Sequence, residues 1–407
     1  MASATLNCQS DNPKRRGSVR ILHVISSIDP ASGGPAEGLK QLSHIYNSGG
    51  HEVHVATLDS PEAVKRFSFP APVIGLGPGA GIYGYTPRAV PWLKEHISSY
   101  DVVFINCIWQ YNAIAAYRAL EHTNTPYGVF THGMLDPYFK RAFPLKHIKK
   151  SIYWHLFLQP VLKNADAVVF TCEEEKILAR ESFSRYKVRE RVLNYGIFGP
   201  DLDLANASGE FLAKWPNLRG KRLAITMGRI HPKKGINILI EAFAKSLARN
   251  PEWELVIAGP DQVGQQAELQ ALASRFGVAE RITWTGMIGN VLKWGALAAS
   301  EVFVLPSHQE NFGIVVAEAL ACKLPVIISD KVNIWREIKA IGAGLVCKDS
   351  VESAQRALNQ WSSLTSEELA EMRDRCTECF DENFNYNMIA TKVLDVTESV
   401  VRQKRLR

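Results

Sequence analysis

Two glutamates, Glu310 and Glu318, are separated by seven residues in the segment HQENFGIVVAEAL. The apolar run at 301–305, which Pro306 ends, predicts a buried strand, and the apolar spacing after Gly313 is typical of a helix. Glu310 is therefore expected in a strand-to-helix loop, with Glu318 about a turn and a half into the helix. The spacing alone fits equally well with a loop acid and a solvated helix acid, so the neighbouring motifs must decide.

The start of this predicted helix offers three backbone amides, those of Phe312, Gly313 and Ile314. Such amides have no partner within their own helix, and they suit a phosphate. In an open α/β sheet, the loops at the carboxyl ends of the strands line the crevice where ligands bind. A carboxylate beside an anion site is unfavourable without a ligand, so Glu310 in this position suggests that sugar hydroxyls are recognised here.

A second predicted strand-to-helix loop, GRIHPKKG at 228–235, carries two cations that suit a diphosphate. Gly228 permits a tight exit from the preceding strand, and a helix is predicted to begin after the loop. Arg229 would contact phosphate as a planar fork and Lys234 as a point charge. The alternative is a solvated basic loop.

Two further candidates lie in the first half of the chain. Gly33 and Gly34 would let the backbone approach a ligand closely, and Pro35 after them suits the first position of a helix. His132 ends a predicted strand at 127–131 and would donate a hydrogen bond to a sugar hydroxyl. A plain strand-to-helix turn and a structural histidine are the respective alternatives.

Three other motifs do not predict a binding site. GLGPGA at 75–80 has the glycine spacing of a dinucleotide site, but no helix is predicted directly after it, so no nucleotide cofactor is expected. Asp201 and Asp203 form a short DxD pattern within a predicted linker, and Cys376 and Cys379 form a lone CxxC pair. We therefore expect no metal site.

The elements that must position these residues alternate between strand and helix in both halves of the chain, which indicates parallel sheets covered by helices. At 407 residues the chain exceeds the usual size of a single core, so two domains are expected. The segment 199–220, rich in Gly, Pro, Asn and Asp, is interpreted as the interdomain linker. We predict a disordered tail, an N-terminal domain and a C-terminal domain at 1–18, 19–200 and 218–385.

Composition narrows the class of protein. Hydrophobic residues make up 46% and charged residues 22% of the chain, as in soluble globular proteins. No apolar run approaches the ~18 residues of a membrane-spanning helix, and the basic N-terminus lacks the pattern of a secretory signal. Seven scattered cysteines indicate a reducing, cytoplasmic setting. The net charge of +6 does not distinguish an anionic substrate, a membrane surface and nucleic acid.

One long segment, 138–163, holds six Lys or Arg residues and no acids, with aromatic residues interleaved among them. Basic and aromatic residues together suit an anionic lipid surface. The alternative is a helix that covers the sheet with its aromatics and exposes its lysines to water. Peripheral contact with the inner face of a membrane, and a lipid-linked acceptor, are therefore hypotheses.

Taken with these motifs, the chain resembles the retaining GT-B glycosyltransferases of family GT4 over nearly its whole length. The likeness rests on the early GGP loop, TCEEE at 171–175, GRIHPKKG at 228–235, TGMIG at 285–289 and the spacing of the two glutamates. The resemblance implies two Rossmann-like, doubly wound parallel-sheet domains that face a central cleft. It also implies a final helix, about 386–401, that crosses back onto the first domain.

The resemblance further implies transfer of a hexose, with retention, from a nucleotide-diphosphate sugar to a hydroxyl acceptor, which is a glycan, a lipid-linked glycan or a small molecule. We expect no metal, no cofactor and no nucleic-acid partner. Alternatives are a nucleotide-sugar epimerase of the same fold and a non-catalytic glycan- or nucleotide-binding protein. By the same resemblance, Glu318 would hold the ribose, and Arg229 and Lys234 would hold the diphosphate, which Gly33 and Gly34 would approach from the other domain. The backbone of Met287 would lie near the base. The groups near the transferred sugar would be Glu310, His132 and the amides of Phe312, Gly313 and Ile314.

Overall fold

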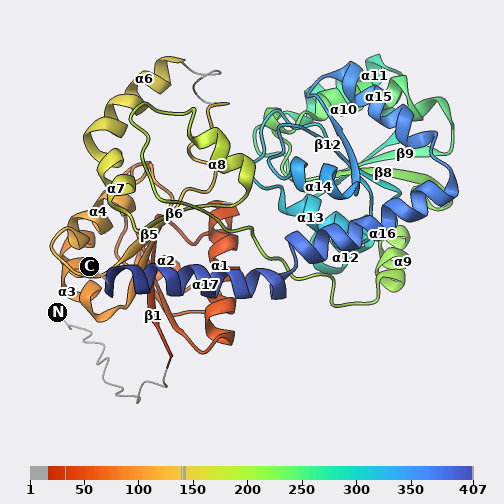
Figure 1. The fold of residues 1–407 in the computed structure, drawn as a ribbon. Helices are drawn as coiled ribbons and strands as arrows, with labels where there is room; N and C mark the ends of the chain where they lie inside the picture. The colour runs from red at the N-terminus through yellow and green to blue at the C-terminus, as the bar shows by residue number, and fades with distance from the viewer. Residues whose placement is uncertain (1–16, 33, 139, 141–143, 406–407) are drawn as a thin grey trace. The chain divides into compact units, whose positions relative to one another are not determined.

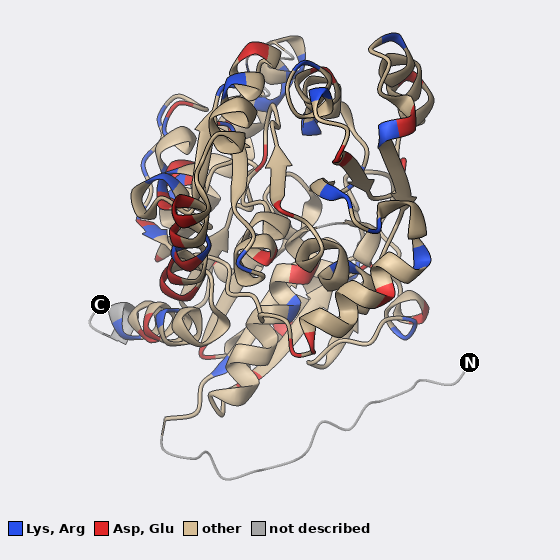
Figure 2. Ribbon diagram, turned by 90° about the vertical axis from the view of Figure 1, so that its right-hand side faces the viewer, with Lys and Arg blue, Asp and Glu red and all other residues tan. Residues whose placement is uncertain are grey.

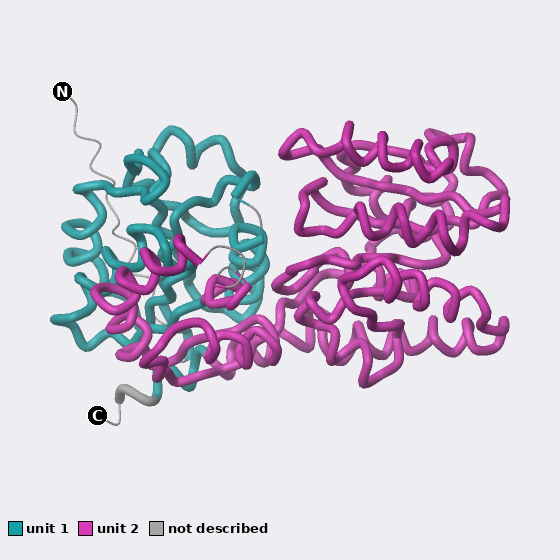
Figure 3. The backbone as a smooth tube through the Cα atoms, turned by 90° about the horizontal axis from the view of Figure 1, so that it is seen from above, with its two compact units in different colours: residues 1–130, 397–407 teal, residues 131–396 magenta. Residues whose placement is uncertain are grey.

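A computed structural model describes residues 17–32, 34–138, 140 and 144–405. Gly33 and most of the predicted tail therefore lie outside the described residues. The chain divides into two compact units, coloured separately in Figure 3. Unit 1 comprises Met1–Phe130 and Thr397–Arg407, and unit 2 comprises Thr131–Val396. The domain bounds drawn from the sequence stay predictions.

The first sheet has seven strands in the order β3-β2-β1-β4-β5-β6-β7. Its central strands are apolar and fully buried, as β4 (VVFIN) shows, because helices cover both faces of a parallel sheet. The strands are β1 Arg20–Ile25, β2 Glu52–Thr57, β3 Val73–Gly75, β4 Val102–Asn106, β5 Tyr127–Phe130, β6 Ala167–Phe170 and β7 Glu190–Val192. The short strand β7 was not predicted from the sequence.

The helices of this half follow the predicted alternation, and Figure 1 shows them with their labels. They are α1 Gly34–Ser48, α2 Pro61–Val64, α3 Ala89–His96, α4 Tyr111–Leu120, α6 Pro144–Tyr153, α7 Gln159–Asn164 and α8 Glu173–Ala179. A π-helical turn, Trp154–Leu158, joins α6 to α7.

The second sheet is parallel, with six strands in the order β10-β9-β8-β11-β12-β13. Strands β8 and β11 are neighbours at the centre of the sheet, and the later strands are added outward on either side of them. The loops after these two strands therefore leave the same edge of the sheet side by side. The strands are β8 Arg222–Met227, β9 Trp253–Ala258, β10 Ile282–Gly286, β11 Val302–Leu305, β12 Val326–Ser329 and β13 Gly344–Cys347. Strand β13 was not predicted.

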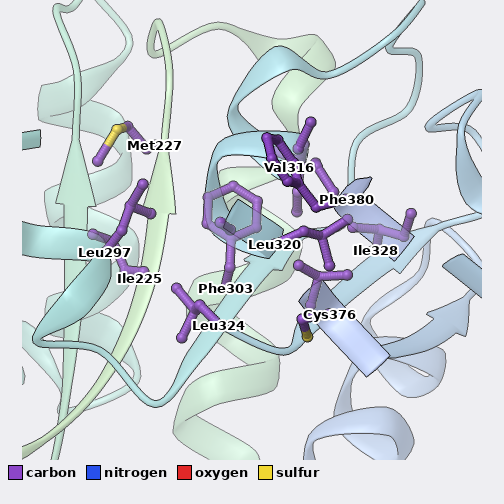
Figure 4. Packing of buried hydrophobic residues seen from close by; sticks show 14 of the residues in the cluster. Ile225, Met227, Leu297, Phe303, Val316, Leu320, Leu324, Ile328, Cys376 and Phe380 are labelled. Carbon is purple, nitrogen blue, oxygen red and sulfur yellow. The ribbon is translucent and has the colours of Figure 1, made fainter. Parts of the chain in front are cut away.

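Helices cover both faces of the second sheet, as Figure 1 shows. On one face lie α10 Ile236–Lys245, α11 Gln266–Arg275 and α15 Val351–Ser362; on the other lie α9 Leu204–Lys214, α12 Asn290–Ala298, α13 Ile314–Ala321, α14 Trp335–Ile341 and α16 Ser366–Asn383. Figure 4 shows the hydrophobic core between the second sheet and the helices on the α13 side. In it, Phe303 of β11 packs with Val316 and Leu320 of α13. Cys376 belongs to the same buried cluster.

The predicted linker 199–220 is corrected by the structure, because α9 lies within it. Asp203 caps this helix, and its side chain accepts hydrogen bonds from the amides of Ala205 and Asn206 at 2.9 and 3.3 Å. The helix packs tightly against α12, since a Cβ atom built on Gly295 would lie 2.1 Å from the carbonyl oxygen of Ala207. The Asp and Asn residues that suggested a linker therefore begin a helix.

The last helix, α17, spans Tyr386–Arg405, and from Thr397 onward the chain belongs to unit 1. There the buried hydroxyls of Tyr46 and Thr397 form a hydrogen bond of 3.1 Å. Within the described residues, no helix has both the length and the apolar character needed to cross a membrane.

Candidate active site

The loops after β8 and β11 lie against each other, and glycine makes the close approach possible. Gly235 has a left-handed backbone, with φ 64°, and a Cβ atom on it would lie 2.2 Å from the carbonyl oxygen of Pro306. One loop also donates to the other, because the amide of His308 bonds the carbonyl oxygen of Lys233 at 2.7 Å. This contact brings the predicted basic loop beside the loop that carries Glu310.

Lys234 and Glu310 form an ion pair between these two loops. Their side chains are 18% and 21% exposed, so water screens the pair only in part. This contact explains how a carboxylate can stand beside an anion site when no ligand is bound. An ammonium group has three donors, so Lys234 can hold Glu310 and a phosphate oxygen together.

A second pair joins Glu318 of α13 to Lys293 of α12, with 2.6 Å between the carboxylate oxygen and Nζ. The ammonium of Lys293 also lies 4.4 Å from the centre of the Trp294 ring. Lys293 was not predicted as a site residue. The available signal was its place one turn into the helix that follows TGMIG, the segment assigned to the base.

The amides at the start of α13 have the predicted character. Gly313 adopts a left-handed backbone with φ 78° and immediately precedes the helix, and Phe312 beside it is buried. Among the described residues, none accepts a hydrogen bond from the amides of Phe312, Gly313 or Ile314. These donors can therefore serve an oxygen-rich ligand.

The remaining predicted donor-binding residues are more exposed or lie elsewhere. Arg229 donates from Nη1 to Oε1 of Gln262 at 2.9 Å. The side chain of Met287 is 81% exposed, so only its backbone suits the predicted contact with a base. Gly34 is the first residue of α1 in unit 1, and Gly33 lies outside the described residues. The predicted role of both glycines stays a prediction.

His132 follows β5 with one residue, Thr131, between them, and has a left-handed backbone of φ 50°. Glu175 of α8 holds the residues on both sides of it, because its Oε1 accepts from the Thr131 hydroxyl and from the Gly133 amide, both at 2.6 Å. Its Oε2 accepts from the amide and hydroxyl of Thr171 at 2.7 Å. Strained backbone that its surroundings hold in place is found often at functional sites.

The imidazole of His132 is buried, and burial lowers the pKa of His132 to about 3. Its ring is therefore neutral at physiological pH. Nδ1 forms a hydrogen bond with the hydroxyl of Tyr195. Neither Glu175 nor Tyr195 was predicted as a site residue; the TCEEE segment that contains Glu175 was noted only as part of the family likeness.

The histidine segment and the Glu310 loop meet within unit 2. The side-chain amide of Asn311 donates to the hydroxyl of Thr171 at 3.0 Å. A Cβ atom on Gly133 would lie 2.5 Å from Cγ of Asn311, so only glycine fits beside this loop. The structure therefore brings His132, Glu310 and Lys234 into one neighbourhood.

A cavity of about 490 Å³ adjoins this neighbourhood. Its volume lies within the range of about 300 to 1,000 Å³ that is usual for ligand pockets. Two of its lining residues are bonded to each other, because Gln309 donates to Asp136 at 3.2 Å; Gln309 also accepts from Lys233 at 3.1 Å. The cavity is lined by residues that include Asp136, Tyr138, His308, Gln309, Lys331 and Asn333.

Several solved structures share this fold along nearly their whole length. Sucrose-phosphate synthase from Thermosynechococcus elongatus matches with a TM-score of 0.74 at 21% identity, over 94% of this chain and 100% of that chain. HepE of Anabaena, solved with UDP and glucose, matches with a TM-score of 0.71 at 16% identity, over 94% and 100%. The two parallel α/β sheets therefore define a GT-B fold.

Sequence comparison identifies the family within that class. The model for "Glycosyl transferase 4-like domain" matches residues 33–196, and the model for "Glycosyl transferases group 1" matches residues 209–379. Together these models cover most of the chain. The protein belongs to the group 1, GT4-type glycosyltransferases.

Individual relatives differ in how much of their length is matched. The D-inositol 3-phosphate glycosyltransferase of Streptomyces griseus is 28% identical over 44% of this chain, and the match spans 39% of that enzyme. The GDP-mannose:cellobiosyl-diphosphopolyprenol alpha-mannosyltransferase of Xanthomonas campestris is 22% identical over 93% of this chain and 96% of that enzyme. These relatives carry transferase names, which does not favour the epimerase alternative.

Proposed function

We propose that this protein transfers a hexose from a nucleotide-diphosphate sugar to a hydroxyl acceptor, with retention at the anomeric carbon and without a metal ion. The observation that carries the proposal is that Lys234, Glu310 and the amides at the start of α13 converge on adjoining loops. Cations and amides suit a diphosphate, and a carboxylate suits sugar hydroxyls. The UDP and glucose bound to HepE support a nucleotide sugar as donor.

In this proposal, the reaction breaks the bond between the anomeric carbon and the diphosphate oxygen. Arg229, Lys234 and the α13 amides stabilise the charge that develops on the departing oxygen. Glu310 and neutral His132 hold the hydroxyls of the transferred sugar, and Glu318 binds the ribose. The acceptor oxygen bonds to the anomeric carbon on the face that the diphosphate leaves, and its proton passes to the departing phosphate oxygen.

Donor turnover tests this proposal. A thermal-shift panel of nucleotide sugars identifies the donor, and release of nucleoside diphosphate is then followed with a panel of acceptors. We expect Lys234→Ala to lower kcat/KM at least about tenfold, because a charge-assisted hydrogen bond contributes about 1.5–3 kcal/mol. Lys245→Ala is the matched control, since Lys245 pairs with Glu241 on α10 at 2.5 Å. Normal turnover by Lys234→Ala would remove the assignment.

Metal independence has its own test. Side chains and helix amides balance the charge of the diphosphate in this proposal, so turnover should persist in EDTA. Among the described residues, no group of three or more His, Cys, Asp or Glu side chains has an arrangement that would hold a metal ion. Loss of activity in EDTA that Mn²⁺ or Mg²⁺ restores would favour a metal mechanism instead.

We further propose that α6 contacts an anionic membrane surface from the cytoplasmic side, and that the acceptor is linked to lipid. Four aliphatic side chains lie three or four positions apart, as on one face of a helix: Leu145, Ile148, Ile152 and Leu156, which are 79%, 57%, 56% and 64% exposed. Lysines interleave with them on α6. Exposed apolar residues with basic neighbours suit an interfacial helix.

The aromatic part of the membrane prediction is corrected for Trp154, which is fully buried. Its ring stacks on Phe183 with 4.9 Å between ring centres, and its Nε1 donates to the carbonyl oxygen of Ser184 at 3.0 Å. Phe139 and Phe143 lie outside the described residues. The surface proposed for lipid is therefore the aliphatic stripe, with Phe157 half exposed at its end.

Co-sedimentation with vesicles tests this contact. Binding should require anionic lipid, fall as salt rises and weaken in Leu145→Ser/Ile148→Ser and in Lys146→Glu/Lys149→Glu. Lys221→Glu is a control, because Lys221 lies in the turn before β8, far along the chain from this helix. Equal recovery with neutral and anionic vesicles, with full activity on a soluble acceptor, would contradict the proposal.

The absence of a nucleic-acid partner is proposed on the charge distribution. Figure 2 shows Lys and Arg interspersed with Asp and Glu along the ribbon. A protein that binds nucleic acid usually gathers its basic residues on one face. A filter-binding assay with single- and double-stranded nucleic acid at physiological salt should show no retention.

A further inference from the structure

The hydroxyl of Tyr195 and Nδ1 of His132 form a buried hydrogen bond between segments 63 residues apart. Both side chains are buried, and the two rings are nearly parallel, at 16°. Tyr195 lies just after β7, in the segment Asn194–Gly196. The contact therefore connects the candidate sugar-binding histidine to a residue that neither the motifs nor the family likeness assigned.

The backbone around Tyr195 is held on its C-terminal side. The amide of Ile197 donates to the carbonyl oxygen of Phe384 at 2.8 Å, and the amide of Tyr386 donates to the carbonyl oxygen of Ile197 at 3.0 Å. A Cβ atom on Gly196 would lie 2.9 Å from Cβ of Ile389, so the chain can approach this closely only with glycine. Tyr195 is thus presented from a fixed backbone.

The ring of Tyr195 also packs edge-to-face on Phe312, with 5.3 Å between the ring centres. Phe312 in turn contacts Phe384 in the same geometry at 5.5 Å. Phe312 precedes Gly313 in the loop whose amides face the proposed sugar and diphosphate. One tyrosine therefore supports two parts of the candidate site, the histidine through its hydroxyl and the loop through its ring.

The chemistry of the two groups decides which of them donates. A neutral imidazole has one N–H and one bare nitrogen, and the partner of one nitrogen fixes the state of the other. An imidazole nitrogen is a stronger base than a phenol oxygen, and a phenol is a good donor. The favoured arrangement is therefore O–H of Tyr195 donating to bare Nδ1, which leaves the hydrogen on Nε2.

We propose that Tyr195 is a positioning residue that holds His132 in the Nε2–H tautomer, so that Nε2 donates a hydrogen bond to an oxygen of the donor sugar. This inference rests on the proposed function of His132. Burial, which lowers the pKa of His132, supports it by keeping the ring neutral. Without the tyrosine hydroxyl, some molecules would carry the hydrogen on Nδ1 and leave Nε2 bare. A bare Nε2 would repel the lone pairs of the sugar oxygen, so the contact would weaken.

The first test is the tautomer, which needs no substrate. The protein is labelled with ¹⁵N-histidine, and His132→Gln identifies the signals of His132 among those of the 11 histidines. We expect the wild type to show an unprotonated Nδ1 and a protonated Nε2, and Tyr195→Phe to show a mixture of tautomers. A protonated Nδ1 in the wild type, or an unchanged spectrum in Tyr195→Phe, would overturn the proposal.

The second test is kinetic, and uses the donor found by the thermal-shift panel. Tyr195→Phe keeps the ring on Phe312, so we expect kcat/KM to fall about tenfold while the Kd of nucleoside diphosphate changes less than about twofold. In a His132→Ala background the same change should have no further effect, because the two residues act as a unit. An additive loss, or wild-type kcat/KM in Tyr195→Phe, would contradict the proposal.

A matched control separates this role from the general loss of a buried hydroxyl. Tyr186 lies in the same unit, and its hydroxyl donates to Oε1 of Glu190 at 3.1 Å. Tyr186→Phe should leave both kcat/KM and the His132 spectrum unchanged. If the wild type turns over no nucleotide sugar, the proposed function fails, whereas the NMR experiment still decides the hydrogen bond between Tyr195 and His132.

Discussion

At the scale of single residues, the candidate site holds two carboxylate–lysine pairs, Glu310 with Lys234 and Glu318 with Lys293. Each pair joins a residue near or on α13 to a neighbouring loop or helix. A positive partner stabilises a glutamate near a phosphate site before the ligand binds, and each of these glutamates has one. The pairs also indicate different roles, because only Lys234 belongs to the loop proposed for the diphosphate.

The division of labour between the two glutamates can be measured. We expect Glu318→Ala to weaken the binding of nucleoside diphosphate about tenfold or more, because hydrogen bonds of a charged group to ribose are lost. Glu310→Ala should bind nucleoside diphosphate at least as tightly as the wild type, since it frees Lys234, yet should lower kcat. Titration calorimetry compares both with Glu241→Ala, a control on α10. Equal loss of affinity in the two site variants would refute the division.

His132 predicts a pH dependence of stability whose sign follows from its lowered pKa, about 3. An unfolded histidine titrates near pH 6.5, so between about pH 3 and 6.5 the unfolded state binds more protons. Its contribution to stability is therefore complete above about pH 6.5 and is lost as the pH falls. Urea unfolding should show the wild type losing stability relative to His132→Gln between about pH 7 and pH 4. Parallel pH profiles would contradict this expectation.

At the scale of elements, two loops at the carboxyl edge of the second sheet position the proposed diphosphate groups. The β8–α10 loop reaches the β11–α13 loop because Gly235 lies against Pro306. Strands β8 and β11 are neighbours in the sheet, so this contact follows from the strand order. The geometry of the site therefore depends on a backbone approach as well as on its charged side chains.

Gly235→Ala tests this approach. The new Cβ would lie 2.2 Å from Pro306 and would require a left-handed backbone, so we expect a loss of about 1–3 kcal/mol in the free energy of unfolding, together with reduced turnover. Gly264→Ala is the matched control, because Gly264 has φ 75° and no atom within 4 Å of a built Cβ. Urea unfolding compares the two variants. If both lose the same stability, the contact with Pro306 contributes nothing beyond backbone strain.

At the scale of the whole molecule, the chain forms one sheet after the other and then returns to unit 1 through α17. Thr397 marks the point where the last helix joins unit 1, and its hydroxyl bonds that of Tyr46 at 3.1 Å. Tyr46 is fully buried, and burial raises the pKa of its phenol well above the usual range. A buried phenol needs a partner, so this hydrogen bond contributes to holding the C-terminal helix on unit 1.

We can predict the effect of removing the Thr397 hydroxyl, which bonds Tyr46 where the last helix joins unit 1. Thr397→Val keeps the shape of the side chain and leaves the hydroxyl of Tyr46 without this partner, so we expect a loss of about 1–3 kcal/mol. Thr397→Ser retains the hydroxyl and should lose less. Urea denaturation followed by circular dichroism measures both. Equal stability of Thr397→Val and the wild type would show that the hydrogen bond does not hold the helix.

The sequence by itself determined the alternation of strands and helices, and the placement of Glu310 in a loop and Glu318 in a helix. These features depend on residue periodicity and turn residues over short windows, which a sequence displays directly. The GT-B class was implied by the family resemblance of the motifs. The helix within 204–214 was missed because its polar N-terminus resembles a linker. Strand β7 was missed because two of its three residues are charged, and β13 because it begins at a glycine.

Only the tertiary structure decided which side chains meet. Lys234 and Glu310 are 76 residues apart, Tyr195 and His132 are 63 apart, and Lys293 and Glu318 are 25 apart. These pairs are created by the order of strands in each sheet and by the packing of the loops and helices that follow them. No short window of sequence contains both partners, so the charges that offset one another and the tautomer of the histidine are set by how distant segments pack.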